Sequence, residues 1–204
     1  MPAFRQLAFV ASYTTTAALP PTWREVAIAG RSNAGKSSLI NAVAQRKRLA
    51  FVSKTPGRTQ QINFFDAGDG AYVVDLPGYG FARVPEAVRR EWGRLLEDYL
   101  LRRAQLVGMI VVMDVRHPLT PLDRRMLAWL RPTGKPVHVV LTKSDRLTRS
   151  QAARTLREVR ADLGQEFQDA SVQLFSSVTR TGLPELQEKL AIWLDKKMPP
   201  VKGE

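Results

Sequence analysis

Apolar and polar residues follow one another along this chain in two patterns: short apolar runs, and longer segments with an apolar residue every three or four positions. Short runs without polar positions are typical of strands buried in a parallel sheet. We predict strands at residues 26–29, 62–66, 72–75, 107–113, 137–141 and 172–175. The second and third are joined by a short connection containing Gly68 and Gly70, which suits an antiparallel hairpin.

The longer segments predict helices, because their apolar residues fall on one helix face. We expect helices at residues 36–44, after Pro85, from 121, at 151–163 and from near 184. Thr120 and Asp123 fit the N-cap and third position of the third helix, which we expect to bury Leu122. The alternation of strands and helices predicts an α/β fold, with a mostly parallel sheet, one antiparallel edge strand and helices on both faces.

The two ends of the chain lack this periodicity. We predict an N-terminal arm at residues 1–22 with one edge strand near residues 7–11, a single folded domain at 23–195, and a disordered basic tail at 196–204.

Composition narrows the class of protein. Of 204 residues, 44% are hydrophobic and 25% charged, with no apolar run near the roughly 18 residues of a membrane span. Without a recognisable export signal, we expect a cytoplasmic protein with no integral membrane association. The absence of cysteine excludes disulfides, cysteine catalysis and cysteine-based zinc sites.

The formal net charge of +12 predicts attraction to polyanions such as nucleic acid or an anionic membrane. An arginine-rich surface without a specific partner would carry the same charge, so both interpretations stay open at this point.

The most specific motif lies between the first strand and the first helix. Residues Gly30 to Ser37 fit G-x-x-x-x-G-K-[ST], a loop whose backbone N–H groups cradle phosphates. Lys36 would lie between the β- and γ-phosphates, and the Ser37 hydroxyl would be a Mg²⁺ ligand.

Three other polar segments follow strand ends, namely Asp75, residues 142–145 and residues 176–177. In open α/β sheets, ligands bind beyond the carboxyl ends of the strands. We therefore expect these segments and the phosphate loop to form one nucleotide site.

These segments together resemble the five nucleotide-binding motifs of Ras-like GTPases, and the chain is most similar to the bacterial EngB family, also called YihA or YsxC. The residues that carry the resemblance are 25–41, 54–60, 75–80, 114–117, 142–145 and 175–177. The resemblance implies a three-layer P-loop NTPase fold of the Ras-like G-domain type that hydrolyses GTP to GDP. It also implies a monomeric switch in assembly of the large ribosomal subunit, with rRNA or ribosomal proteins as partners and a link to cell division and septation.

The fourth motif decides which base is bound. The Asp145 carboxylate can accept both N–H donors on the Watson–Crick edge of guanine, whereas adenine offers no such pair. Lys143 would pack its stem along the base.

The resemblance also implies the roles of individual residues. Lys36, Thr59 and Gly78 are the expected catalytic residues, and Mg²⁺ would be held by Ser37, by Thr59 when GTP is bound, and by Asp75 through water. The expected nucleotide contacts are Gly30, Arg31, Ser32, Asn33, Ala34, Gly35, Lys36, Ser37, Ser38, Gly57, Arg58, Thr59, Gln60, Gln61, Asp75, Leu76, Pro77, Gly78, Thr142, Lys143, Ser144, Asp145, Phe175, Ser176 and Ser177.

Three positions call for separate expectations. Asn33 is a candidate K⁺ ligand by similarity to K⁺-using GTPases, or a loop residue that favours turn geometry, and both stay open. Thr142 replaces the usual Asn of N-K-x-D, so its hydroxyl must make the contact to the phosphate loop. Tyr79 replaces the Gln that orients water, so we expect slow intrinsic hydrolysis and a partner that completes the site.

Two rival functions remain at this point. A P-loop kinase or ATPase would prefer adenine, which Asp145 disfavours. A binding module with a structural nucleotide would use its basic surface to hold RNA or membrane. We expect structural roles for His117 and His138, which lie in a turn and a strand.

Overall fold

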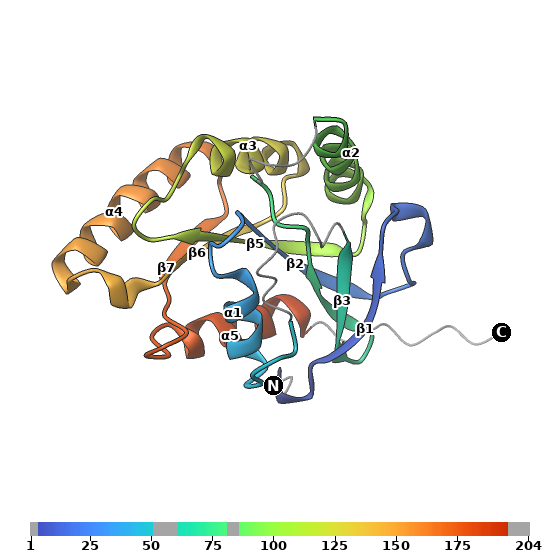
Figure 1. Cartoon of the computed structure of the whole chain (residues 1–204), viewed down its shortest axis with the longest axis horizontal. Helices are drawn as coiled ribbons and strands as arrows, with labels where there is room; N and C mark the ends of the chain where they lie inside the picture. Colours follow the sequence, from blue (N-terminus) through green and yellow to red (C-terminus); the bar gives the residue numbers. More distant parts are fainter. Residues whose placement is uncertain (1–3, 51–60, 81–85, 196–204) are drawn as a thin grey trace.

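The computed structural model describes residues 4–50, 61–80 and 86–195 (Figure 1). The predicted site residues Gly57, Arg58, Thr59 and Gln60 and the predicted tail at 196–204 lie outside the described residues.

A seven-stranded sheet forms the centre of the protein, with strand order β1-β3-β4-β2-β5-β6-β7. Its strands are β1 (Ala8–Tyr13), β2 (Arg24–Gly30), β3 (Ile62–Gly68), β4 (Ala71–Asp75), β5 (Leu106–Asp114), β6 (Val137–Thr142) and β7 (Ala170–Leu174). The five strands from β4 to β7 in this order pair in parallel, and β3 is antiparallel to both β4 and β1. The predicted mostly parallel sheet is confirmed.

Helices cover both faces of the sheet, as predicted. They are α1 (Lys36–Val43), α2 (Glu86–Arg102), α3 (Pro121–Leu130), α4 (Arg149–Glu166) and α5 (Leu183–Leu194). Figure 1 shows α2, α3 and α4 on one face and α1 and α5 on the other. Among the helices that the structure describes, none has the length and apolar character needed to cross a membrane.

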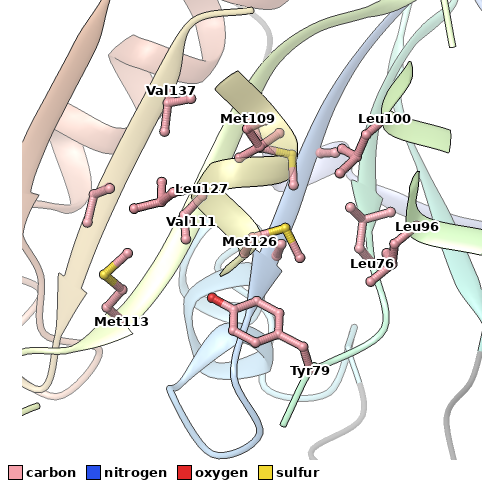
Figure 2. Packing of buried hydrophobic residues seen from close by; sticks show 14 of the residues in the cluster. Leu76, Tyr79, Leu96, Leu100, Met109, Val111, Met113, Met126, Leu127 and Val137 are labelled. Carbon is pink, nitrogen blue, oxygen red and sulfur yellow. The ribbon is translucent and has the colours of Figure 1, made fainter. Parts of the chain in front are cut away.

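Each face of the sheet has its own hydrophobic core, because successive strand residues point to opposite faces. Ala27 and Ala29 of β2 pack toward α2, α3 and α4, whereas Val26 and Ile28 pack toward α1 and α5. Figure 2 shows the first core, where Met126 of α3 lies among residues of the sheet and α2.

The N-terminal segment belongs to this sheet. Strand β1 pairs along the outer side of β3, and Phe4 and Leu7 just before it are buried in the second core. The single antiparallel strand is therefore β3, and it lies one position in from the edge because β1 covers it.

Two details differ from the sequence predictions. Helix α4 begins at Arg149 rather than 151, because Thr148 and Gln151 form a capping box at its start. The expectation that Leu122 is buried was wrong. This side chain is 40% exposed and lies against Gly80, whose φ of 88° requires a glycine-like backbone.

Helix α5 lies unusually close to the sheet at one point. A Cβ atom on Gly108 of β5 would come within 2.6 Å of the Trp193 ring. Glycine at this position therefore allows the indole to lie directly on the strand.

Candidate functional site

The phosphate loop occupies residues 31–35, between the end of β2 and the start of α1. Asn33 and Gly35 both have positive φ, 64° and 103°, and Gly35 is the N-cap residue of α1. This conformation brings the chain directly into the first turn of α1, where free backbone N–H groups and the helix dipole favour a bound anion.

Strand β6 tethers this loop from the neighbouring side. The Thr142 hydroxyl donates to the carbonyl of Ala34 and lies 3.1 Å from the carbonyl oxygen of Met113. The Lys143 ammonium donates to the Asn33 carbonyl at 2.8 Å. The predicted hydroxyl contact between Thr142 and the loop is thus present.

A cation and a carboxylate meet where the phosphates of a nucleotide would lie. Lys36, the first residue of α1, forms an ion pair with Asp75 at the carboxyl end of β4. Asn63 of β3 donates to the other Asp75 oxygen at 3.3 Å, and its own carbonyl accepts from Ser12 of β1 at 2.6 Å. The N-terminal segment is therefore linked to the acid at the site, a connection that we did not predict.

The residues near Lys36 suit a magnesium ion by their chemistry. Ser37 offers a hydroxyl oxygen from the next position of α1, and Asp75 offers carboxylate oxygens from β4. Hard oxygen donors of this kind are the ligands that Mg²⁺ prefers.

A second loop pair forms beside the phosphate loop, at the ends of β6 and β7. The Ser176 hydroxyl, which is fully buried, donates to Asp145 at 2.6 Å and accepts the backbone N–H groups of Val178 and Thr179. The Ser144 N–H donates to the carbonyl of Phe175 at 3.1 Å. These bonds fix the direction of the Asp145 carboxylate, which is what the recognition of a base edge requires.

Asp114 at the end of β5 holds Lys143 in place. Its carboxylate lies 2.9 Å from the Lys143 ammonium and accepts two hydrogen bonds from the Arg116 guanidinium. Burial alone would raise the pKa of Asp114, but the hydrogen bonds from Arg116 and Lys143 outweigh burial and lower that pKa. Residues 114–117 carry part of the family resemblance, but the sequence assigned no role to Asp114, so its contact with Lys143 was not predicted.

Tyr79 follows the D-x-x-G motif, and its side chain is buried in the first core (Figure 2). Its hydroxyl donates to Asp123 of α3 at 3.0 Å. Burial and the neighbouring carboxylate raise the pKa of this phenol. Tyr79 therefore stays protonated and acts as a structural hydrogen-bond donor to Asp123.

Several predicted contact residues can offer only backbone groups. Leu76 and Phe175 have fully buried side chains in the two cores, and the ring of Pro77 is buried as well.

Two other predicted contact residues have exposed side chains. These are Gln61, just before β3, and Ser177, which follows the buried Ser176. Nucleotide contacts by these residues stay predictions.

The chain matches a family model described as a 50S ribosome-binding GTPase over residues 25–143. It is also similar to curated proteins named probable GTP-binding protein EngB. The protein from Aromatoleum aromaticum is 56% identical over 195 residues, which is 95% of this chain and 90% of that protein. The protein from Dechloromonas aromatica is 50% identical, covering all of this chain and 97% of that protein.

Solved structures agree on the fold. A crystal structure of a probable GTP-binding protein engB matches with a TM-score of 0.66 at 20% identity, covering 84% of this chain and 98% of that one. The structure of Era in complex with MgGDPNP and a segment of 16S ribosomal RNA matches with a TM-score of 0.67 at 21% identity, over 86% of this chain and 58% of that one.

Proposed function

Because this chain belongs to the EngB family of GTP-binding P-loop GTPases, we propose that it is a GTP-driven switch in assembly of the large ribosomal subunit. The observation that carries the proposal is the convergence of the phosphate loop, Asp75 and Asp145 at one edge of the sheet. Groups whose chemistry suits phosphates, a metal ion and the edge of a guanine base lie together there, which supports the proposal.

Guanine recognition is assigned to Asp145. One oxygen of its carboxylate accepts the buried Ser176 hydroxyl, and the other lies 3.5 Å from Nε of Arg146, so the carboxylate is already oriented when the N–H pair of guanine arrives. Lys143, held by Asp114, supplies the stem that covers the base. An adenine nucleotide would leave this carboxylate without its donors, which disfavours the kinase alternative.

Phosphate and metal binding are assigned to the other side of the site. Lys36 and the first turn of α1 would bind the phosphates, and Ser37 and Asp75 would hold Mg²⁺, the latter through water. Thr59, outside the described residues, is proposed as a further ligand when GTP is bound. The ion would neutralise charge that develops on the phosphates.

Hydrolysis is proposed to be slow until a partner binds. Tyr79 stands where related enzymes carry a water-orienting Gln, and its hydroxyl is bound to Asp123. Intrinsic turnover should therefore be no faster than the roughly 10⁻⁴ to 10⁻³ s⁻¹ of unaided small GTPases. Gly78 and Thr59 are the proposed sensors of the γ-phosphate.

The partner is proposed to be the large ribosomal subunit, acting on a cytoplasmic monomer. The family description and the net charge of +12 support an RNA-rich partner. The link to cell division and septation is proposed as a consequence of this role.

Sedimentation with purified ribosomal subunits tests the switch. We expect the protein to follow the large subunit when a GTP analogue is present, and to leave it with GDP. Binding that depends on salt alone, with no dependence on nucleotide, would instead support a binding module in which the nucleotide is structural. A Lys36→Ala variant that kept its cellular task would support the same alternative.

Potassium dependence is tested separately. Asn33 lies in the loop with positive φ, a conformation that Asn adopts readily, so turn geometry alone accounts for its presence. A higher GTPase rate in KCl than in NaCl, lost in Asn33→Ala, would assign it as a K⁺ ligand.

A further inference from the structure

Asp123 is a fully buried carboxylate that joins three elements. One oxygen accepts the Tyr79 hydroxyl at 3.0 Å. The other accepts the backbone N–H and hydroxyl of Thr120, at 2.9 and 2.7 Å, and lies 3.4 Å from Nε of Arg31 in the phosphate loop. A capping box requires only the Thr120 contacts, so the hydrogen bond from Tyr79 and the ion pair with Arg31 are additional to helix capping.

The backbone of Tyr79 is fixed at the same place. Its N–H donates to the Gly30 carbonyl at 3.2 Å, and its carbonyl accepts the Ser32 N–H at 2.9 Å. On the other side, Leu122 of α3 packs over Gly80. The chain after Gly78 is therefore held both to the phosphate loop and to α3.

Gly78 precedes this anchor directly, so its N–H direction depends on where Tyr79 is held. We propose that Asp123 is a positioning residue for GTP recognition, which holds Gly78 toward the γ-phosphate through Tyr79 and so favours GTP over GDP. The inference rests on the proposed function, in which Gly78 senses the γ-phosphate.

The effect should be larger for GTP than for GDP. The phosphate loop has its own tethers to Thr142 and Lys143, which do not involve Tyr79. GDP has no γ-phosphate and relies on that loop and on the base contacts. Loosening Tyr79 should therefore weaken GTP binding more than GDP binding.

The chain contains a matched control at the opposite end of β2. The Tyr99 hydroxyl donates at 2.7 Å to Glu25, a fully buried carboxylate that also pairs with Arg103 at 2.6 Å. This triad has the same chemistry as Tyr79, Asp123 and Arg31 but lies at the amino end of the strand, away from the site. Tyr99→Phe removes one buried hydroxyl, as Tyr79→Phe does.

The experiment measures dissociation constants of GDP and of a non-hydrolysable GTP analogue for the full chain with Mg²⁺. In Tyr79→Phe the ratio of analogue to GDP affinity should fall roughly five- to tenfold, the effect of about one buried hydrogen bond. Asp123→Asn, which cannot accept from Tyr79 and Thr120 at once and still pair with Arg31, should lower the ratio at least as much. Tyr99→Phe should leave the ratio unchanged.

Thermal unfolding of each variant checks that it is folded at the assay temperature. An unchanged or increased ratio in Tyr79→Phe, or an equal fall in Tyr99→Phe, would overturn the inference. Failure of the wild-type protein to bind either guanine nucleotide would instead overturn the proposed function, so the two failures are distinguishable.

Discussion

At the scale of single residues, Asp145 has the most direct consequence for the choice of nucleotide. Asp145→Asn replaces one acceptor oxygen by an N–H donor while Ser176 remains beside it. We expect GTP affinity to fall at least 100-fold, because buried polar groups that face guanine would lose their partners. A xanthine nucleotide, which carries a carbonyl in place of the guanine amino group, should bind the variant better than GTP does.

Equilibrium titration with labelled nucleotides gives this comparison directly. The conservative variant Ser176→Ala serves as its control, since it removes only the orienting hydroxyl. In Ser176→Ala we expect a smaller loss of GTP affinity and no increase in the affinity for a xanthine nucleotide. GTP binding by Asp145→Asn at wild-type strength would contradict the assignment.

His138 is a residue whose effect is on stability rather than chemistry. Burial lowers the pKa of this imidazole to about 4, although the hydrogen bond with Gln173 partly opposes the shift. The unfolded chain, with an ordinary pKa of about 6.5, then binds more protons than the folded chain between these values. The free energy of unfolding should be constant above pH 6.5 and fall by roughly 3 kcal/mol as the pH drops toward 4.

Urea unfolding between pH 4 and pH 7.5 measures this dependence. In His138→Gln, the fall in the free energy of unfolding that is due to the imidazole of His138 should vanish. The other histidine of the chain, His117, is exposed, and His117→Gln is the matched control that leaves the buried His138 in place. Identical profiles for all three proteins would contradict the assignment.

At the scale of elements, variants of the N-terminal segment show whether β1 and the residues before it stabilise the folded domain. Leu7, just before β1, is fully buried, whereas Val10 within β1 is 48% exposed. Leu7→Ala should lower the free energy of unfolding by about 2–4 kcal/mol, because it leaves a cavity in the second core. Val10→Ala removes apolar atoms from the same segment and should cost less than about 1 kcal/mol.

Chemical denaturation of both variants measures the difference. Equal, small effects would mean that β1 contributes little to the stability of the sheet. Because Ser12 and Asn63 connect β1 to Asp75, we also expect Leu7→Ala to weaken Mg²⁺-dependent nucleotide binding.

The elements differ in how well the sequence predicted them. The strands with continuous apolar runs and the helices with one apolar face were predicted within a few residues, because their signals are local. The pairing of β1 with β3 was not, since its partner lies about fifty residues away and β1 mixes small, polar and aromatic residues. Long-range pairing of this kind depends on which surface remains uncovered, and no local pattern encodes that.

The site shows the same division. The phosphate loop and Asp145 have motifs, so they were predicted, and Thr142 was correctly expected to bind the loop by its hydroxyl. Asp123 was predicted only as a helix cap, because its contacts with Tyr79 and Arg31 arise from packing between elements. Residues that position others carry weaker sequence signals than those that bind ligands.

At the scale of the whole molecule, positive charge is unevenly neutralised. On α4, Arg154 pairs with Glu158, and Asp162 and Glu166 of the same helix face Arg124. Arg46, Lys47 and Arg48 follow α1 as an exposed basic segment. In the part of the chain that the structure describes, no acidic side chain pairs with them.

We expect this basic segment to contribute to ribosome binding. Replacing its three residues by alanine should weaken binding to the large subunit and reduce the slope of log K against log salt by about 2–3, as three lost phosphate contacts would. The control replaces Arg149, Arg157 and Arg160 of α4 by alanine, which removes the same number of positive charges. It should change the slope less. Sedimentation at several salt concentrations compares them, and equal slopes in both variants would contradict this placement.

The contact between Gly108 and Trp193 has a consequence for genetics. A single added methyl group at Gly108 would act as a wedge between α5 and the sheet, at a cost of about 1–3 kcal/mol. The nucleotide-binding residues would be untouched. A strain carrying Gly108→Ala should therefore keep the folded protein when cool and lose it when warm, providing a conditional allele that removes the protein on a temperature shift.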